Sequence, residues 1–242
     1  MHLIFVSWIK NCSTSILSFD IVQFFLFINH QILLLILNKT GFDPKISHFF
    51  NNYLVNKKTK YFWNNFSSPF FDVNIGVGQA SALLSILSAL YLFYQLYIYY
   101  QYFIFLKKDL KNLKIPISVI SFIDNSLFIS QNKFFHISNS NLFCSYYVIS
   151  LLLEQFGLVI KHGKTEVFHF SRLQEAFNPL PSYFSILGGP ILCPKETWCY
   201  FSFIFDRKLY FHQHVNFYVN KAFSTVKSIK MLGNLTKDLV PS

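Results

Sequence analysis

A run of uncharged side chains from residue 80 to residue 106 restricts the fold of this chain more than any other feature. As a helix, the run is long enough to span a bilayer, and two lysines follow it as they would at a membrane surface. In a globular domain the same helix must be buried, and Gln95 and Gln101 within the run favour this environment. We therefore expect no stable membrane association. The alternative is a small integral membrane protein with a spanning helix near residues 80–106.

The chain is strongly basic, with 21 Lys+Arg against 11 Asp+Glu and a formal net charge of +10. An excess of this size favours a polyanionic partner, either a nucleic acid or an anionic lipid surface. The four cysteines contain no C-x-x-C pair, which argues against a disulfide framework and against a zinc site. Charged residues make up only 13% of the chain, while Phe (31) and Tyr (14) are abundant. We attribute this composition to drift toward A/T-rich codons.

Hydrophobic patterning predicts short strands alternating with helices, and hence an α+β fold in one compact unit. Strands are expected over 16–20, 61–63, 117–123, 127–130 and in a hairpin over 198–205, and helices over 23–37, from Pro44, within 80–106, over 142–156 and over 214–232. The first ten residues are apolar but lack the basic start of a signal peptide, and no element is assigned to them.

Two acids stand at the ends of expected strands. Asp20 ends the first strand, and Asp124 lies at the turn between the runs 117–123 and 127–130. Two carboxylates presented from adjacent strands are what a two-metal site needs, since its Mg²⁺ ions lie roughly 4 Å apart and hold both the attacking and the leaving oxygen.

Five segments resemble, in chain order, motifs A to E of reverse transcriptases, and they are similar in particular to those of fungal LINE-type (non-LTR) retrotransposons. The segments are Phe19–Phe25 for motif A, Gly76–Ser85 for motif B, Ser121–Asn125 for motif C, Phe156–Glu166 for motif D and Trp198–Ser202 for motif E.

This resemblance implies the palm of a right-hand polymerase, in which a small antiparallel sheet carries Asp20 and Asp124 and helices pack on one face. Residues 1–212 would form the palm, with the fingers largely missing, and residues 213–242 the beginning of a thumb or connection helix. The implied activity is RNA-templated DNA synthesis by two-metal nucleotidyl transfer. Its partners would be an RNA template, a DNA primer and deoxynucleoside triphosphates.

The resemblance also implies a role for each matching residue. Asp20 and Asp124 would hold two Mg²⁺ ions, and Lys164 would protonate the departing pyrophosphate as a general acid. Phe25 would exclude a 2′-OH beneath the sugar. The loop residues Gly78, Gln79 and Ser81 would contact the template and the incoming nucleotide. Lysines on the last helix would grip duplex phosphates.

The sequence departs from these motifs at the second acid of motif C, where Asn125 stands, at Ala80 in place of a glycine, and at Phe201-Ser202 in place of Leu-Gly. An amide keeps an oxygen ligand but carries no negative charge, so Asn125 would hold a metal less strongly. We hypothesise a degenerate element altered by C-to-T and G-to-A transitions, and we expect no primer extension from the isolated chain. A nucleic-acid-binding remnant without catalysis is a second alternative.

Overall fold

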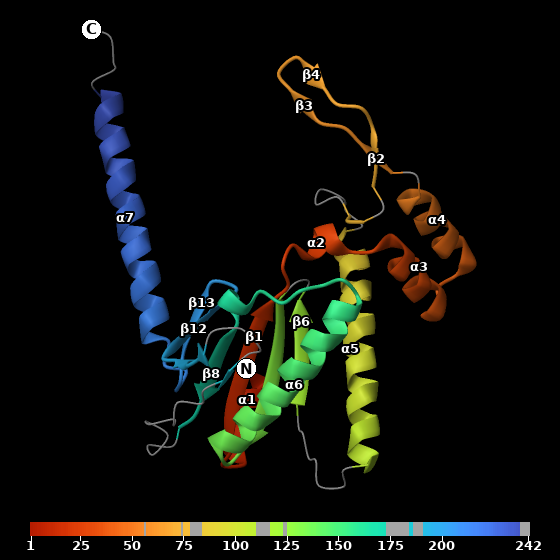
Figure 1. Cartoon of the computed structure of the whole chain (residues 1–242). Helices are drawn as coiled ribbons and strands as arrows, with labels where there is room; N and C mark the ends of the chain where they lie inside the picture. The colour runs from red at the N-terminus through yellow and green to blue at the C-terminus, as the bar shows by residue number, and fades with distance from the viewer. Residues whose placement is uncertain are drawn as a thin grey trace.

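The computed structural model describes residues 1–55, 57–73, 75–77, 84–109, 117–122, 125–172, 184–185 and 191–237. A five-stranded sheet with the order β11-β8-β1-β7-β6 lies at its centre (Figure 1). Its strands are β1 (Ser13–Asp20), β6 (Ile117–Phe122), β7 (Asn125–Asn132), β8 (Glu166–Phe170) and β11 (Pro194–Lys195). The described pairs are antiparallel, apart from β11 with β8. The α+β class and the antiparallel character of the sheet are as predicted.

The remaining elements surround this sheet. The helices are α1 (His2–Ile9), α2 (Phe24–Phe27), α3 (His30–Lys39), α4 (Pro44–Leu54), α5 (Leu84–Asp109), α6 (Phe135–Gln155), the short 3-10 helix η1 (His162–Lys164) and α7 (His212–Lys237). The short strands are β2 (Lys58–Thr59), β3 (Phe62–Trp63), β4 (Phe66–Ser67), β5 (Phe71–Asp72), β9 (Phe184–Ser185), β10 (Ile191–Leu192), β12 (Thr197–Tyr200) and β13 (Phe203–Asp206).

Both faces of the sheet are covered. Neighbouring residues of β1 point to opposite faces, and each face packs against a different hydrophobic cluster. Leu17 and Phe19 pack in a large core that includes residues of α5 and α6. Ile16 packs on the other side, in a cluster that includes Ile4 of α1. The prediction that helices pack on one face is therefore wrong. The apolar N-terminal residues, to which no element was assigned, fold into α1 and cover the second face.

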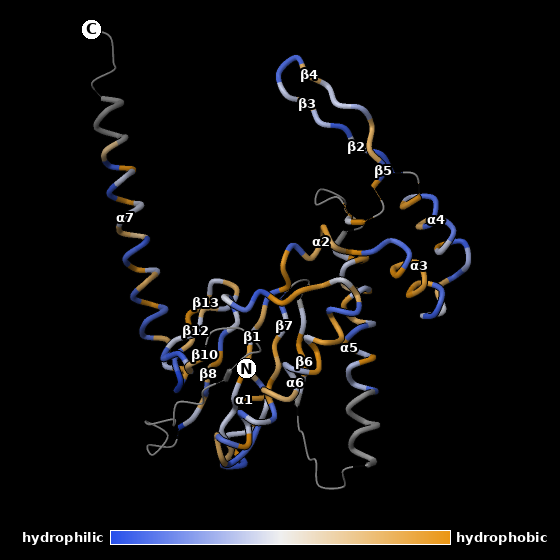
Figure 2. Tube along the Cα trace, viewed as in Figure 1, coloured by the Kyte–Doolittle hydropathy of each residue, from blue (hydrophilic) through white to orange (hydrophobic). Residues whose placement is uncertain are grey.

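From Leu84 onward the uncharged run lies in α5, which buries one side and exposes the other. Leu87, Tyr91, Gln95 and Tyr99, at spacings of four residues, are buried, whereas Phe93 is exposed. The buried side contacts α3 and α6. Within the described residues, we find no helix that has both the length and the apolarity needed to cross a membrane. Figure 2 shows hydrophobic residues gathered along the sheet and the helices against it.

The predicted helix over 23–37 is divided into α2 and α3. Ile28 and Asn29 have extended backbones, and the Asn29 side chain caps α3 by accepting a hydrogen bond from the Ile32 N–H at 3.1 Å. The next helix begins at Pro44 as predicted. Its first turn is capped by Asp43, whose carboxylate accepts a hydrogen bond from the Lys45 N–H at 2.7 Å.

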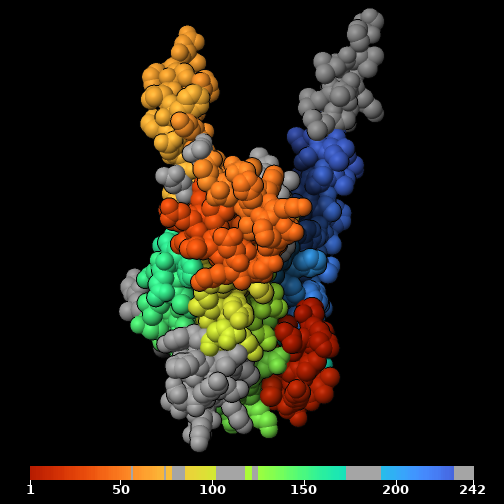
Figure 3. All heavy atoms as spheres, turned by 90° about the vertical axis from the view of Figure 1, so that its right-hand side faces the viewer, coloured from red at the N-terminus to blue at the C-terminus, as the bar shows by residue number. Residues whose placement is uncertain are grey.

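Two elements project from the body of the molecule. The long helix α7 rises beside β12 and β13, and a two-stranded ribbon made from β2 to β5 rises near α4 (Figure 1). A view turned by 90° shows both projections pointing the same way from the body (Figure 3). The described residues of α7 are almost all exposed.

Candidate catalytic site

The candidate site lies where β1 ends. The register of the sheet places the Cα of Asp20 opposite that of Asn125 on β7, and Asn125 also pairs with Phe122 on β6. Asp124, which precedes Asn125 in the sequence, lies outside the described residues. The structure therefore brings two of the three predicted metal-ligating positions, Asp20 and Asn125, together at one edge of the sheet.

Lys164 reaches the same edge from η1. Its Nζ lies 2.9 Å from Oδ2 of Asp20. The Asp20 side chain is 15% exposed and that of Lys164 is 60% exposed. An ion pair with so exposed a partner contributes little to stability, about 0–1 kcal/mol. The ion pair matters for the geometry of the site, because it places an ammonium beside the carboxylate at the end of β1.

The segment before Lys164 is fixed to the end of β1 by backbone hydrogen bonds. The Lys161 N–H donates to the Asp20 carbonyl at 2.7 Å, and the Val22 N–H donates to the Val159 carbonyl at 2.8 Å. Between these bonds, Ile21 and Ile160 form an antiparallel bridge. Residues 20–22 and 159–161 are thus paired along their backbones. This pairing explains why two side chains 144 positions apart meet.

Tyr146 of α6 supports this segment from the core side, and sequence reasoning missed it. Its Oη lies 2.7 Å from Nδ1 of His162, in η1, and its ring packs edge-on against Phe19 at 6.0 Å. Burial raises the pKa of the Tyr146 hydroxyl. In the sequence, Tyr146 is one of two adjacent tyrosines in an apolar helix, and no local signal separates it from ordinary core residues.

The oxygen donors of this edge agree in type with a magnesium site. Mg²⁺ prefers carboxylate and carbonyl oxygens, and the described residues offer the Asp20 carboxylate with the Asn125 amide on the neighbouring strand. No cluster of three or more His, Cys, Asp or Glu side chains suited to a metal occurs within the described part of the chain. The ammonium of Lys164 already neutralises one oxygen of Asp20.

Phe25 and the start of the motif B-like segment lie side by side. Phe25 belongs to α2 and is partly buried against the large core. The Val77 N–H donates to the Phe25 carbonyl at 2.9 Å, and the Gly76 N–H donates to the Ile28 carbonyl at 2.8 Å. His30 donates from Nε2 to the Gly76 carbonyl at 2.6 Å. These bonds hold residues 76–77 against α2.

The other predicted nucleotide-binding residues, Gly78, Gln79 and Ser81, lie outside the described residues. Gly76, immediately before them, has a φ of +83°. This left-handed conformation suits glycine, because other residues pay for the contact between Cβ and backbone.

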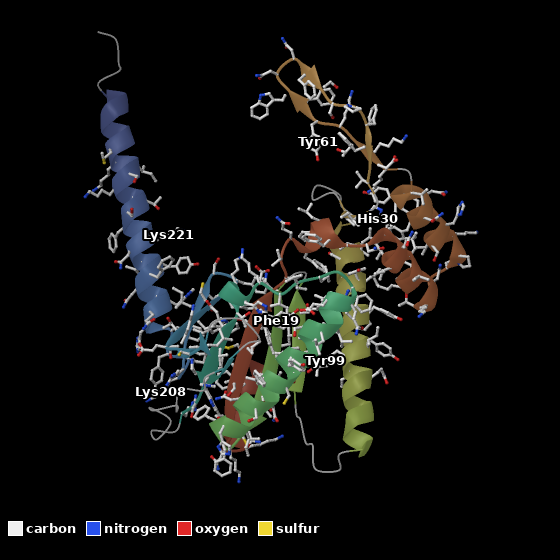
Figure 4. All side chains as sticks on the ribbon, in the orientation of Figure 1. Phe19, His30, Tyr61, Tyr99, Lys208 and Lys221 are labelled. Carbon is white, nitrogen blue, oxygen red and sulfur yellow. The ribbon has the colours of Figure 1, made fainter. Side chains whose placement is uncertain are left out.

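The motif E-like hairpin leads into α7. Trp198 is buried and stacks on Tyr200 with ring centroids 4.9 Å apart. Beyond the hairpin, the Asp206 carboxylate accepts hydrogen bonds from the N–H groups of Lys208, Tyr210 and Phe211. This turn directs α7 away from the sheet. Figure 4 shows Lys221 on that helix, Phe19 within the sheet and Tyr61 on the projecting ribbon.

No protein-family model matches this chain, and no curated protein matches it either. Among solved structures, similar chains include telomerases of Candida species. The apo telomerase of Candida tropicalis truncated from its C-terminal domain has a TM-score of 0.48 at 10% identity, covering 85% of this chain and 37% of that one.

Two further structures hold a TWJ fragment of telomeric RNA. The Candida tropicalis telomerase complex gives a TM-score of 0.48 at 14% identity, covering 71% of this chain and 29% of that one. The Candida albicans complex gives 0.38 at 15% identity, covering 64% and 26%. The chain thus spans about a third of the length of these structures or less. At such TM-scores the likeness defines neither the fold nor the activity of this chain.

Proposed function

We propose that this chain is the palm region of a reverse transcriptase of a LINE-type retroelement, with α7 as the beginning of its thumb. The proposal is supported by five motif-like segments in the family's order, and above all by one observation. The register of β1 sets Asp20 opposite Asn125, and Lys164 reaches Asp20 from the motif D-like segment. Three residues from three separate motif-like segments thus meet at one edge of the sheet.

In this proposal Asp20, Asp124 and Asn125 hold divalent ions, which when bound supply positive charge to the reacting phosphates. Lys164 acts as the general acid that donates its Nζ proton to the departing pyrophosphate. Phe25 lies under the sugar, and Gly78, Gln79 and Ser81 line the path of the template and the incoming nucleotide. Catalysis of this kind depends on positioning and on charge and requires no protein nucleophile.

Asn125 weakens the metal site in the proposal. Restoring an acid there adds one negative charge beside the bound ion. A unit charge about 4 Å from a divalent ion contributes roughly 2 kcal/mol at the dielectric constant of water, which is about 30-fold in affinity. The variant Asn125→Asp is therefore expected to bind Mn²⁺ about 30-fold more tightly than the native chain.

A matched control exists on the same strand. Asn132 ends β7 at the opposite edge of the sheet, where it pairs with Ser13. The variant Asn132→Asp adds the same charge far from Asp20 and is expected to leave Mn²⁺ affinity unchanged. Titration of the full chain with Mn²⁺, followed by electron paramagnetic resonance of the free ion, measures both variants. Affinities that agree within twofold between the two variants contradict the proposal.

A nucleic-acid-binding remnant without catalysis is the second candidate, and the amide of Asn125 favours it. Primer extension on an RNA template separates the two. The native chain is expected to give none, whereas extension by Asn125→Asp that disappears in the double variant with Asp20→Asn supports the catalytic reading. Binding of a primer–template duplex with no extension by any variant supports the remnant.

A further inference from the structure

The projecting ribbon, residues 57–73, exposes six aromatic side chains to solvent. They are Tyr61, Phe62, Trp63, Phe66, Phe70 and Phe71, each with between 46% and 77% of its surface exposed. None of them belongs to either hydrophobic core. Exposed apolar patches of this kind mark binding surfaces in folded proteins.

The ribbon is an ordered hairpin. Phe62 pairs with Ser67 and Trp63 with Phe66 near the tip, while Lys58 pairs with Asp72 near the base. Between these pairs, the Ser68 N–H donates to the Tyr61 carbonyl at 2.9 Å. Backbone pairing at the tip and at the base thus presents the side chains of the ribbon on two faces.

One face carries a row of aromatic rings. Directly opposed residues share a face, so Trp63 lies with Phe66, and Tyr61, two positions from Trp63, lies on the same side. The Tyr61 ring also contacts that of Phe71, with centroids 6.0 Å apart. The aromatic row therefore extends from the base of the ribbon to its tip.

The other face combines aromatic rings with cations. The Lys60 ammonium lies 4.4 Å from the Phe62 ring centroid and 5.1 Å from that of Phe70. Lys58, two positions away in β2, is also exposed, and its ammonium lies 4.0 Å from the Asp72 carboxylate in an exposed ion pair. With Lys57 and one acid, Asp72, the ribbon carries three positive charges and one negative, a net charge of +2.

We propose that this ribbon binds single-stranded nucleic acid, with bases stacked on Tyr61 and Trp63 and phosphates held by Lys58 and Lys60. Aromatic rings stack with every base, and lysines neutralise a phosphate backbone irrespective of sequence. The positive charge fits a polyanion, as does the net charge of +10 of the whole chain. The proposal deepens the proposed function and rests on it only for the choice of polyanion.

An anionic membrane surface is the competing ligand, and the tip of the ribbon argues against it. Asn64 and Asn65 form the turn, and Asn64 has a φ of +52°. Inserting this tip into a bilayer would strip water from two amide side chains and from the turn backbone, at a cost that the flanking rings would have to offset. A nucleic acid lying along the ribbon leaves the tip hydrated.

The test uses the full chain and fluorescein-labelled 12-nucleotide oligo-U and oligo-dT, with binding followed by fluorescence anisotropy. Trp63→Ala is expected to weaken binding roughly 5- to 150-fold, the loss of one stacked base. Lys58→Ala with Lys60→Ala is expected to reduce the slope of log K against log salt by about 1.4. If Trp63→Ala weakens binding of oligo-U alone, the ligand is RNA. If it weakens binding of oligo-U and oligo-dT equally, the ribbon binds single-stranded RNA and DNA alike.

The matched control is Phe93→Ala with Tyr97→Ala on α5, which removes exposed aromatics outside the ribbon. Trp63→Ala that binds oligonucleotides within twofold of this control overturns the proposal. The proposal also fails where Trp63→Ala loses only its binding to phosphatidylserine vesicles. These variants leave Asp20 untouched, so their failure is distinct from that of the Mn²⁺ titrations.

Discussion

Gly76 provides a direct test of how the start of the motif B-like segment is held against α2. Its φ is +83°, and a Cβ added there would lie 3.0 Å from the Leu26 carbonyl oxygen and 3.3 Å from the Leu26 Cα. Both neighbours are backbone atoms of the short helix that carries Phe25. Neither can move without shifting α2.

The cost of Gly76→Ala is the sum of three contributions. The left-handed conformation costs about 1–2 kcal/mol for a residue with a Cβ. The contact with Leu26 adds about 1–3 kcal/mol, as overpacking does elsewhere. The reduced entropy of the unfolded chain returns about 0.4–1 kcal/mol. The net loss in the free energy of unfolding is therefore about 1–5 kcal/mol, near 3 kcal/mol at the middle of each range.

Gly41 isolates the contact contribution. It has a φ of +76°, and a Cβ there would meet no atom within 4 Å. Gly41→Ala is thus expected to cost only about 1 kcal/mol, the conformational term less the entropy gain. Urea unfolding of both variants, followed by circular dichroism, measures the difference. Equal losses in the two variants refute the view that residue 76 is held against the backbone of α2.

Three further outcomes are expected from urea unfolding. Burial, followed by the nearby Arg207, lowers the pKa of His169 to about 4 from 6.5. Stability is then complete above pH 6.5 and falls as the pH drops toward 4, by about 2 kcal/mol between pH 7 and pH 5. In His169→Gln this fall should be smaller by that amount, and an unchanged pH dependence contradicts the assignment. Leu17→Ala, at the centre of β1 and 1% exposed, should lose about 2–5 kcal/mol, and a loss below about 1 kcal/mol would place it outside the core. Tyr146→Phe should lose about 1 kcal/mol with the hydrogen bond to His162, and an unchanged stability would mean that the bond contributes nothing.

Local patterns predicted the elements that present the site. The β-rich runs on either side of Asp124 form β6 and β7, and the strand ending in Asp20 pairs with β7. Pro44, preceded by Asp43, marked the start of α4 correctly. These elements could be predicted because the residues that determine each of them are neighbours in the sequence.

Long-range contacts account for what the sequence could not predict. The division of the helix over 23–37 follows from the cap at Asn29 and from the bond between Gly76 and Ile28, 48 positions apart. The helix α6 begins at Phe135, seven positions before its predicted start. Its first turns hold the buried polar residues Ser138 and Asn139, which resemble a loop in composition.

The role of α1 was missed for a related reason. Its residues are apolar on all sides, so periodicity could not show which of them face a partner. Ile4 is buried because it packs on the face of the sheet that α1 covers, in a cluster with Ile16 and Phe168. The pairing of Asp20 with Lys164 likewise depends on tertiary structure, since it needs residues 159–161 to pair with residues 20–22.

The central place of β1 has a consequence for synthesis of the protein on the ribosome. This strand is translated before both of its neighbours, residues 125–132 and 166–170. At roughly 5–20 residues per second, the 150 positions between Asp20 and Phe170 take about 8–30 s to translate. For that interval, a strand that is mostly buried in the folded protein has at least one open edge, the kind of surface that pairs with other chains. Translation arrested before residue 166 would leave that edge open permanently.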